Sequence, residues 1–141
     1  MTNDYSVTVR REIAAPAEDL FDAWLDAESL ATWLRPASNR ETRVDTDPRV
    51  GGTFRFAMGG DESVTVCTGS YLEIDRPRRL VFTWSSPDTE HRDSIVTVTF
   101  EPSANSTVVE IHQVGLPDER SRDSHHAGWS KILRELGRTA L

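Results

Sequence analysis

The sequence predicts an α+β fold, in which an antiparallel sheet of about six to seven strands packs against one long C-terminal helix. Three patterns support this fold class. Residues 41–115 consist almost entirely of strand patterns joined by short turns, which is typical of an antiparallel meander and not of βαβ units. Two short helical patterns follow the first strand. Residues 117–141 then form one amphipathic helix, the only large element left to bury the apolar face of the sheet.

The N-terminal part is expected to form a strand and two short helices. In residues 5–13 apolar and polar side chains alternate, and the charged Arg11 falls on the apolar face. Pro16 suits the first turn of a helix, where its missing N–H is not needed. The apolar residues that follow repeat at helical spacing with a break near residues 26–28, and Pro36 ends the second helix.

The central part of the chain is expected to form a sheet whose strands succeed one another through tight turns. Glycine, proline and asparagine mark these turns because they adopt turn conformations more readily than other residues. The turn signals are Pro48, Gly51-Gly52, Gly59-Gly60-Asp61, Arg76-Pro77 and Asn105. The strand patterns lie at residues 41–47, 53–58, 63–75, 79–86, 94–102 and 106–115.

The last helix contains a stretch that combines histidine, glycine and tryptophan, HHAGWSKILREL. Trp129 and Leu133 belong to its apolar stripe, and His125 lies one turn earlier on the same side. Gly128 costs about 1 kcal/mol relative to alanine inside a helix, which predicts a close approach between helix and sheet at this position. No linker pattern interrupts the chain, so residues 1–141 are expected to form one domain.

Composition argues against some classes of partner. The net charge is −7 and the basic residues are scattered, with Lys131 as the one lysine, so nucleic acid and anionic membrane surfaces are not expected to bind. No run approaches the roughly 20 apolar residues that span a bilayer, and no apolar signal region is visible at the start. The single cysteine, Cys67, cannot form an internal disulfide, and a cytoplasmic location is therefore expected.

Neither a metal site nor a catalytic nucleophile is expected. His125 and His126 point about 100° apart on a helix and cannot bind one ion together, and a zinc site needs about three protein ligands or more. Cys67 has no partnered base in the strand pattern and is expected to be a buried, inert thiol. The glycine pairs are turns and not phosphate-binding loops. No cofactor and no catalytic residue are therefore assigned, and binding is favoured over catalysis.

Two polar residues on apolar strand faces are candidates for contact with a ligand, since burying them without partners costs about 1–3 kcal/mol each. Arg11 would favour a ligand carboxylate or phenolate by donating two hydrogen bonds to it. The alternative is a structural ion pair with Glu73 or another acidic residue of a neighbouring strand. Gln113 shares a face with apolar neighbours, while His112 points to the other face.

Five segments, in order, resemble the signature segments of one family. They are REIAAP…LFDAWLDAESLATWLRP, GGTFRF, GSYLEIDRPRRLVFTW, SIVTVTFEP…STVVEIHQVGL and HHAGWSKILREL. The family is the one named for the activator of the heat-shock protein 90 ATPase, within the START-like (SRPBCC) superfamily, and the resemblance extends over residues 7–136. It implies a helix-grip fold, in which a curved antiparallel sheet wraps around the C-terminal helix. An elongated cavity would lie between them, closed at one end by the two short helices.

The resemblance implies a cavity without naming its contents, because relatives include chaperone cofactors, lipid and hormone carriers, and aromatic-polyketide cyclases. Arg11 resembles an arginine often found just before the AP of this family. Gln113 stands where many relatives carry histidine. That departure removes an acid–base group from the cavity and lowers the expectation of catalysis.

Taken together, these patterns predict a cavity that binds a small hydrophobic or amphipathic molecule between the sheet and the last helix. One alternative is a cofactor that activates a chaperone ATPase through its surface, and another is a cyclase- or dehydratase-like enzyme that would use His125. The expected partner is a small lipophilic molecule, with a homodimer or a chaperone as alternatives. For any single aromatic residue, simple filling of the core is the alternative to lining a cavity. The residues expected to line it are Arg11, Trp33, Phe54, Phe56, Tyr71, Phe82, Trp84, Gln113, His125, Trp129 and Leu133.

Overall fold

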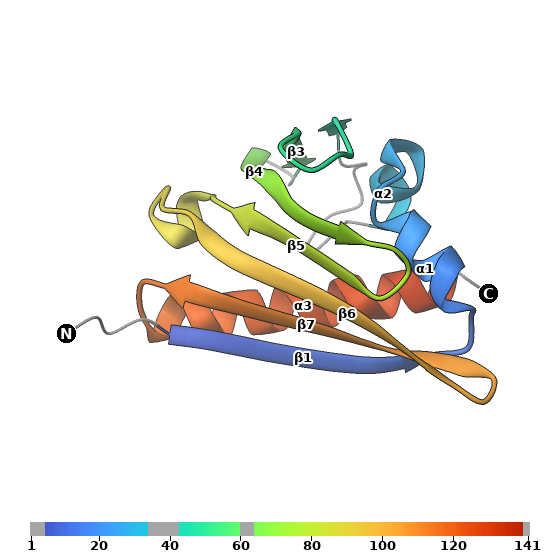
Figure 1. The fold of residues 1–141 in the computed structure, drawn as a ribbon. Coiled ribbons are helices and arrows are strands. Elements are labelled where there is room, and N and C mark those ends of the chain that lie inside the picture. The colour runs from blue at the N-terminus through green and yellow to red at the C-terminus, as the bar shows by residue number, and fades with distance from the viewer. Residues whose placement is uncertain (1–4, 34–42, 60–63, 140–141) are drawn as a thin grey trace.

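The computed structural model describes residues 5–33, 43–59 and 64–139, which form a sheet, two short helices, a 3-10 turn and a long C-terminal helix (Figure 1). The strands are β1 (Tyr5–Ile13), β2 (Arg43–Thr46), β3 (Thr53–Gly59), β4 (Val64–Asp75), β5 (Arg79–Trp84), β6 (Ser94–Ser103) and β7 (Ser106–Leu116). The helices are α1 (Ala17–Ala23), α2 (Ala27–Trp33) and α3 (Glu119–Thr139), with the 3-10 turn η1 (Pro87–Thr89).

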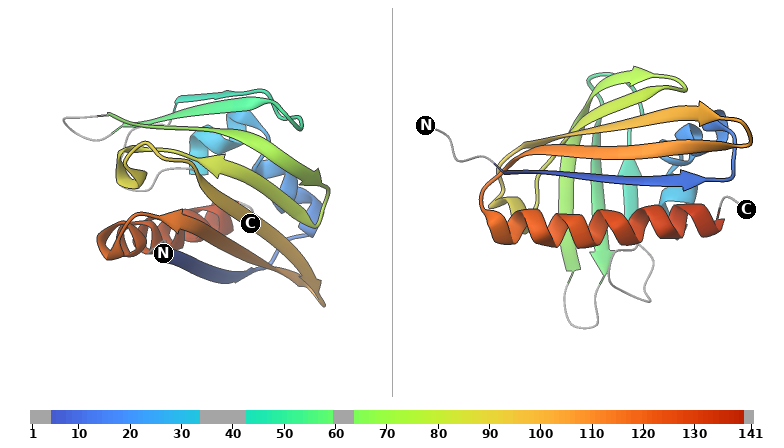
Figure 2. Two further views of the ribbon diagram at one scale, coloured as in Figure 1. Left: turned by 60° about the vertical axis from the view of Figure 1, so that its left-hand side comes forward. Right: turned by 90° about the horizontal axis from the view of Figure 1, so that it is seen from below.

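The sheet has seven strands in the order β1-β7-β6-β5-β4-β3-β2, and every neighbouring pair is antiparallel. Strands β2 to β7 therefore follow one another as a meander, and β1 joins the edge beside β7. Figure 2 shows the sheet curving, with α3 running along β1 and β7 and the short helices on the side of β3 and β4. The predicted α+β helix-grip fold, with a curved sheet of about six to seven strands, is confirmed.

The core lies between the concave face of the sheet and the helices. The predicted inward faces of β5 and β6 are buried, with Leu80, Phe82, Val96 and Val98 at most 3% exposed. In β5 the residue on the other face, Val81, is buried too, at 8%. The predicted stripe of α3 is also buried, and its members are Trp129, Ile132, Leu133 and Leu136. Helix α3 packs mainly against β1 and β7, and it reaches β5 through Trp129, whose ring centroid lies 5.0 Å from that of Trp84.

Two helices begin at acidic side chains that accept hydrogen bonds from their first turns. Asp26 Oδ2 accepts from the backbone N–H of Ser29 (3.1 Å), which starts α2 at the predicted break. Asp118 Oδ1 accepts from the backbone N–H of Ser121 (2.8 Å) at the start of α3. Among the described helices, none is long and apolar enough to cross a membrane. Two predicted features lie outside the described residues, the turn at Gly60-Asp61 and the helix end at Pro36.

A β-bulge at Leu72 changes which face the end of β4 presents. The register with β5 shifts between Tyr71 and Glu73, so Leu72 is the extra residue, and it is 46% exposed. Beyond the bulge Ile74 packs against the core, and Glu73 lies on the outer face in an ion pair with Arg79 (3.4 Å). Simple alternation from Tyr71 onward would have placed these side chains on the opposite faces.

Gly69 of β4 and Phe54 of β3 are cross-strand partners, and the ring of Phe54 lies close over the glycine. A Cβ atom at Gly69 would lie 2.4 Å from Phe54 Cζ and 2.0 Å from the carbonyl oxygen of Thr83, so no side chain fits there without a shift. Gly128 in α3 differs, since a Cβ atom there would meet nothing within 4 Å. The close approach between helix and sheet predicted at Gly128 is therefore wrong.

Candidate functional site

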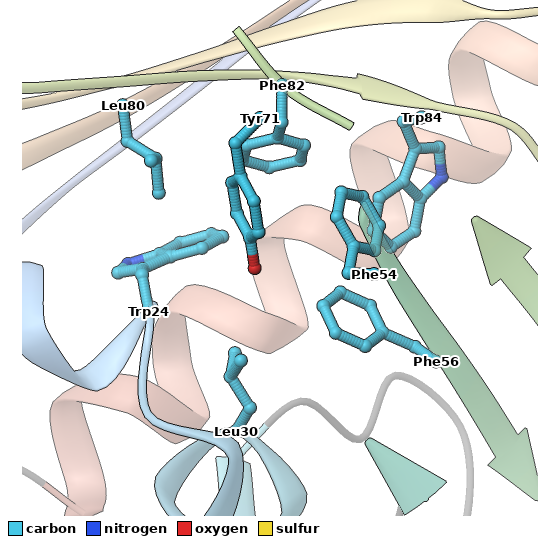
Figure 3. Close-up of a pocket in the computed structure, with 8 residues that line it drawn as sticks. All are labelled: Trp24, Leu30, Phe54, Phe56, Tyr71, Leu80, Phe82 and Trp84. Atoms are coloured by element: carbon cyan, nitrogen blue, oxygen red, sulfur yellow. The ribbon is translucent and has the colours of Figure 1, made fainter. Parts of the chain in front are cut away.

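A small apolar pocket lies between β3, β4 and β5 on one side and the two short helices on the other (Figure 3). The enclosed space is about 10 Å³, roughly the room that one water molecule needs, and it is partly open to solvent. None of the side chains that line it in the described structure is charged. The lining residues are Trp24, Leu30, Phe54, Phe56, Tyr71, Leu80, Phe82 and Trp84.

Phe54 is the centre of the aromatic cluster that forms the sheet side of the pocket. Its ring stacks on Phe56 with centroids 4.6 Å apart and meets Phe82 edge to face at 5.5 Å. The rings of Tyr71 and Trp84 lie 5.4 and 6.1 Å from it. Such pairs are each worth about 0.5–1.5 kcal/mol beyond the apolar area that they bury. Mutual packing of the rings therefore holds this wall of the pocket in place.

Trp24 directly follows α1 and faces the aromatic cluster together with Leu30 (Figure 3). Its ring packs edge to face on Trp33 with centroids 4.7 Å apart. Trp33 Nε1 donates to the carbonyl oxygen of Ala23 (3.2 Å), which ties α2 to the end of α1. The Nε1 atom of Trp24 is buried and has no hydrogen-bond partner among the described residues. The short helices thus present one apolar wall to the pocket.

Tyr71 supplies a hydroxyl group to the pocket wall. Its oxygen points into the space between Trp24 and Phe54 (Figure 3), and it is hydrogen-bonded to Thr46 Oγ1 at 2.5 Å. Burial raises the pKa of Tyr71, and the bond to Thr46 offsets this only in part. The phenol is therefore neutral at pH 7, so it offers a ligand a polar contact without a charge.

Comparison with known proteins places this architecture in a family. A family model described as Activator of Hsp90 ATPase homolog 1-like protein matches residues 14–140. The chain belongs to this family. The family resemblance carried by the sequence motifs is thereby confirmed. A comparison with curated protein sequences finds no significant match.

Solved structures of bacterial proteins share the fold of this Hsp90-activator-like chain. Protein CV1439 from Chromobacterium violaceum is 27% identical, with a TM-score of 0.80, covering 96% of this chain and 97% of that one. Protein MLL2253 from Mesorhizobium loti is 26% identical, with a TM-score of 0.75, covering 95% of each chain. CalU16 from Micromonospora echinospora is 24% identical, with a TM-score of 0.73, covering 94% of this chain and 74% of its own.

In this member of the family, only some of the residues that were predicted to line the cavity line the pocket. The predicted residues at the pocket are Phe54, Phe56, Tyr71, Phe82 and Trp84. The predicted residues that do not line it are Arg11, Trp33, Gln113, His125, Trp129 and Leu133, of which Trp33 and Trp129 pack on the lining residues Trp24 and Trp84. This pocket lies at β3 to β5, whereas α3 packs mainly against β1 and β7, so the residues predicted on α3 do not line it.

Arg11 lies exposed on β1 and does not line the pocket. Its Nε atom sits beside Gly137 of α3, 3.6 Å from where a Cβ atom of that residue would be. The suggested ion pair with Glu73 is wrong as well, since the bulge in β4 puts Glu73 on the outer face with Arg79. Arg11 is therefore not placed to bind a ligand in this pocket.

Gln113 and Trp129 are buried and bind each other. Trp129 Nε1 donates to Gln113 Oε1 (2.7 Å), and Gln113 Nε2 donates to Ser94 Oγ (2.9 Å). Ser94 Oγ in turn donates to the carbonyl oxygen of Trp84 (2.7 Å). This chain of hydrogen bonds joins α3 to β7, β6 and β5 and gives each of the buried side chains a partner, as buried polar groups require. Neither residue lines the pocket, but the Trp129 ring packs on two side chains that do, Trp84 at 5.0 Å and Trp24 at 6.4 Å between centroids.

His125 lies in the first turns of α3, away from the pocket, and is 8% exposed. Its Nδ1 atom lies 2.8 Å from the carbonyl oxygen of Ser121, so Nδ1 carries a proton and donates it. This bond holds the ring against its own helix. Within the described residues, no group of three or more histidine, cysteine or acidic side chains is placed to hold a metal ion.

Cys67 is 1% exposed, as a buried residue of β4. Burial, and to a smaller degree the charge of Asp88, raise the pKa of the thiol to about 12, although a hydrogen bond with Ser86 lowers it. The thiol therefore stays protonated at neutral pH, and a protonated thiol is a poor nucleophile. The prediction of a buried, inert cysteine agrees with this environment.

The sequence analysis missed three residues of the pocket, Trp24, Leu30 and Leu80. Helical spacing shows which face of a short helix is buried, but it does not show which strand that face meets. Leu30 therefore carried no sequence signal for this site, whereas Trp24 belongs to the set of aromatic residues that could be expected to converge on one interior. Leu80 did, because it shares one strand face with Phe82 and Trp84, which were both predicted to line the cavity.

Proposed function

We propose that the protein binds a small, neutral, largely apolar molecule in the pocket between β3–β5 and the two short helices. The observation that carries this proposal is the lining of a space open to solvent, which consists, among the described residues, of eight apolar or aromatic side chains and no charged one. Ligand sites are typically lined in this way, with few polar groups to fix orientation. Membership in a family whose relatives include lipid and hormone carriers also supports it.

The size of the pocket and the lack of charge in its described lining limit which molecules can bind there. The enclosed space is about 10 Å³, roughly the room that one water molecule needs, so the lining side chains must move apart before a ring compound can enter. An ionised group would lose its hydration without gaining a partner, because the described lining contains no opposite charge. The expected ligand is therefore a compact neutral molecule with an aromatic or aliphatic body.

Binding is a better account of the pocket than catalysis. Tyr71 is the titratable side chain on the described wall, and its raised pKa keeps it neutral at pH 7. A neutral phenol at that pH is not a general base. His125, the residue that a cyclase or dehydratase would have used, lies away from the pocket. We therefore propose binding, and not catalysis, as the function of this pocket.

A chaperone cofactor is the second candidate, favoured by the description of the family itself. Such a cofactor would bind a chaperone ATPase through its surface and would have no need of the pocket. The test is the ATPase rate of purified heat-shock protein 90 with and without this protein. Stimulation that persists when the pocket is blocked by a bound ligand would favour the cofactor role.

We also propose that the protein acts in the cytoplasm, where thiols stay reduced, since its one cysteine is buried and unpaired. A homodimer is a further proposal. The strands β1 and β2 are at the two ends of the sheet order, and an edge strand can pair with a second copy. Native mass spectrometry reports the number of chains directly.

Native mass spectrometry also tests the binding proposal. Gently purified protein is expected to carry an added mass that disappears on denaturation. Protein freed of ligand is then titrated by NMR with acetophenone, which is neutral, and with benzoate, a charged molecule of similar size. Acetophenone should shift signals of residues around the pocket, and benzoate should not. If the protein carries no added mass and acetophenone shifts none of its NMR signals, the binding proposal is wrong.

A further inference from the structure

The pocket is too small for the ligand proposed above, so one of its walls has to move. Its enclosed space is about 10 Å³, roughly the room that one water molecule needs. The sheet wall cannot open without breaking hydrogen bonds, because β3, β4 and β5 are joined by antiparallel ladders. The opposite wall, to which the short helices contribute Trp24 and Leu30, can move without that loss (Figure 3).

Residues 17–33, which contain both short helices, contact the sheet mainly through apolar side chains. The ring of Trp24 packs on Phe82, with centroids 6.3 Å apart. Within the described structure, the only hydrogen bonds between residues 17–33 and the sheet or its turns are the two that Arg76 donates to Asp22. Both of these side chains are about half exposed, so water can replace the link when it breaks.

The two short helices are joined to each other by directional contacts. Trp33 Nε1 donates to the carbonyl oxygen of Ala23 (3.2 Å), and the Trp33 ring packs edge to face on Trp24 at 4.7 Å. Across the break between the helices, the backbone N–H of Asp26 donates to the carbonyl oxygen of Asp22 (3.0 Å). Helices α1 and α2 can therefore move as one body.

This body is fixed to the sheet near the start of α1. Just before the helix, Thr107 Oγ1 donates to the carbonyl oxygen of Ala15 (2.8 Å), which ties the chain to β7. Within the helix, the Phe21 ring packs edge to face on Phe100 of β6, with centroids 5.2 Å apart. Both contacts precede Trp24 in the chain, so a rotation about them carries Trp24 and α2 away from the rings of the sheet.

We propose that α1 and α2 form a lid over the pocket and that the ion pair between Asp22 and Arg76 holds this lid closed. When the pair breaks, the helices rotate away from β3–β5 and the ligand enters, and the pair forms again as the lid closes. This inference rests on the proposed function and specifies how its site opens. Because the pair is present in the closed state with and without ligand, it controls the rates of binding and release and leaves the affinity unchanged.

The first test replaces Arg76 by glutamine and uses Arg78→Gln as the matched control. Arg78 lies in the same turn and pairs with Asp75 (3.0 Å), not with the helices. In NMR line-shape analysis of a titration, acetophenone is expected to bind and leave Arg76→Gln roughly two- to fivefold faster than wild type, at the same Kd. This factor is the size of one exposed ion pair. Arg78→Gln should keep the wild-type rates.

Native-state hydrogen exchange tests the lid without a ligand. Backbone amides of residues 17–33 are expected to exchange through an opening that exposes less surface than global unfolding. Their exchange should therefore depend more weakly on urea than that of amides in β5 and β6. In Arg76→Gln the exchange of the helix amides should be roughly two- to fivefold faster, and in Arg78→Gln it should match the wild type.

The outcomes separate the two proposals. If acetophenone does not bind, the proposed function fails, and the exchange data alone decide whether the helices open. If acetophenone binds but Arg76→Gln leaves both rates at their wild-type values, the role of the ion pair is overturned. If the helix amides show the same urea dependence as the sheet amides, the helices open only when the whole protein unfolds, and the lid is overturned.

Discussion

Gln113 shows why a polar side chain can occupy the centre of an apolar core. It is 0% exposed, accepts a hydrogen bond from Trp129 and donates one to Ser94. A leucine of similar volume would fill the space but leave the Trp129 indole N–H without an acceptor. An unpaired buried group costs about 1–3 kcal/mol, more than the gain from one additional apolar contact. The amide therefore links α3 to the sheet and does not serve a ligand.

Gln113→Leu is expected to lower the free energy of unfolding by about 2–3 kcal/mol, measured by urea denaturation. Val114→Ala, at the next position and 38% exposed, should change it by no more than about 0.5 kcal/mol. In a Trp129→Phe background, which lacks the indole N–H, the cost of Gln113→Leu should be smaller. Equal costs in the two backgrounds would show that the hydrogen bond between these residues is not what the substitution removes.

Strand β4 owes its shape to two local features on either side of Tyr71. Gly69 leaves room for the Phe54 ring against the backbone, and the bulge at Leu72 shifts the register with β5. A bulge increases the local twist of a strand, and a glycine permits close approach of a neighbouring group. Together they set Tyr71 and Phe54 side by side on the pocket wall, with ring centroids 5.4 Å apart.

Gly69→Ala and Gly128→Ala are expected to change stability in opposite directions. At Gly69 the new methyl group would overlap a backbone oxygen and the Phe54 ring, so the free energy of unfolding should fall by about 2–3 kcal/mol. At Gly128 it meets nothing, so the higher helix propensity of alanine should raise stability by up to about 1 kcal/mol. Thermal or urea denaturation of both variants measures the two changes in the free energy of unfolding. If both substitutions changed it in the same direction, this explanation would be wrong.

The first short helix is tied to the turn between β4 and β5 by an ion pair. Arg76 donates two hydrogen bonds to the carboxylate of Asp22, at 2.8 and 2.9 Å. The hydrogen bond from Arg76 is the main reason that the pKa of Asp22 lies below its ordinary value of 3.8. Both side chains are about half exposed, so solvent and salt weaken the pair.

This pair should give Asp22→Asn a pH-dependent cost. Because the folded pKa of Asp22 is lowered, the pair stabilises the fold above about pH 4 and loses its effect as pH falls through the lowered pKa. The difference in unfolding free energy between wild type and Asp22→Asn should therefore be small but positive at pH 7. This difference should vanish in strong acid. It should also become smaller in 1 M salt, because salt screens the attraction between the two charges. Glu101→Gln, at an exposed residue, should change the free energy of unfolding at pH 7 by no more than about 0.5 kcal/mol.

The order of the elements could be predicted from the sequence because it depends on local patterns. Alternation in β5 and β6, the stripe of α3 and the break before α2 are each decided within a few residues. The location of the pocket was not predictable in this way. It depends on how far α3 extends over the sheet and on which helix face meets β3, and both are long-range properties. A single extra residue, Leu72, was enough to turn Glu73 away from the position expected for it.

The pocket lies between parts of the chain that are distant in sequence, so a bound ligand should stabilise the whole fold. Its lining comes from β3, β4, β5 and the two short helices, and these positions separate when the chain unfolds. A ligand that binds only the folded state, at tenfold its Kd, adds about 1.4 kcal/mol to the unfolding free energy. For a chain of this size the Tm should then rise by about 4–7 °C. Acetophenone is expected to raise Tm in this way, and to do so equally in Gly128→Ala, whose substitution lies outside the pocket. Benzoate should leave Tm unchanged, and an equal rise with benzoate would mean that the site accepts charge and lies elsewhere.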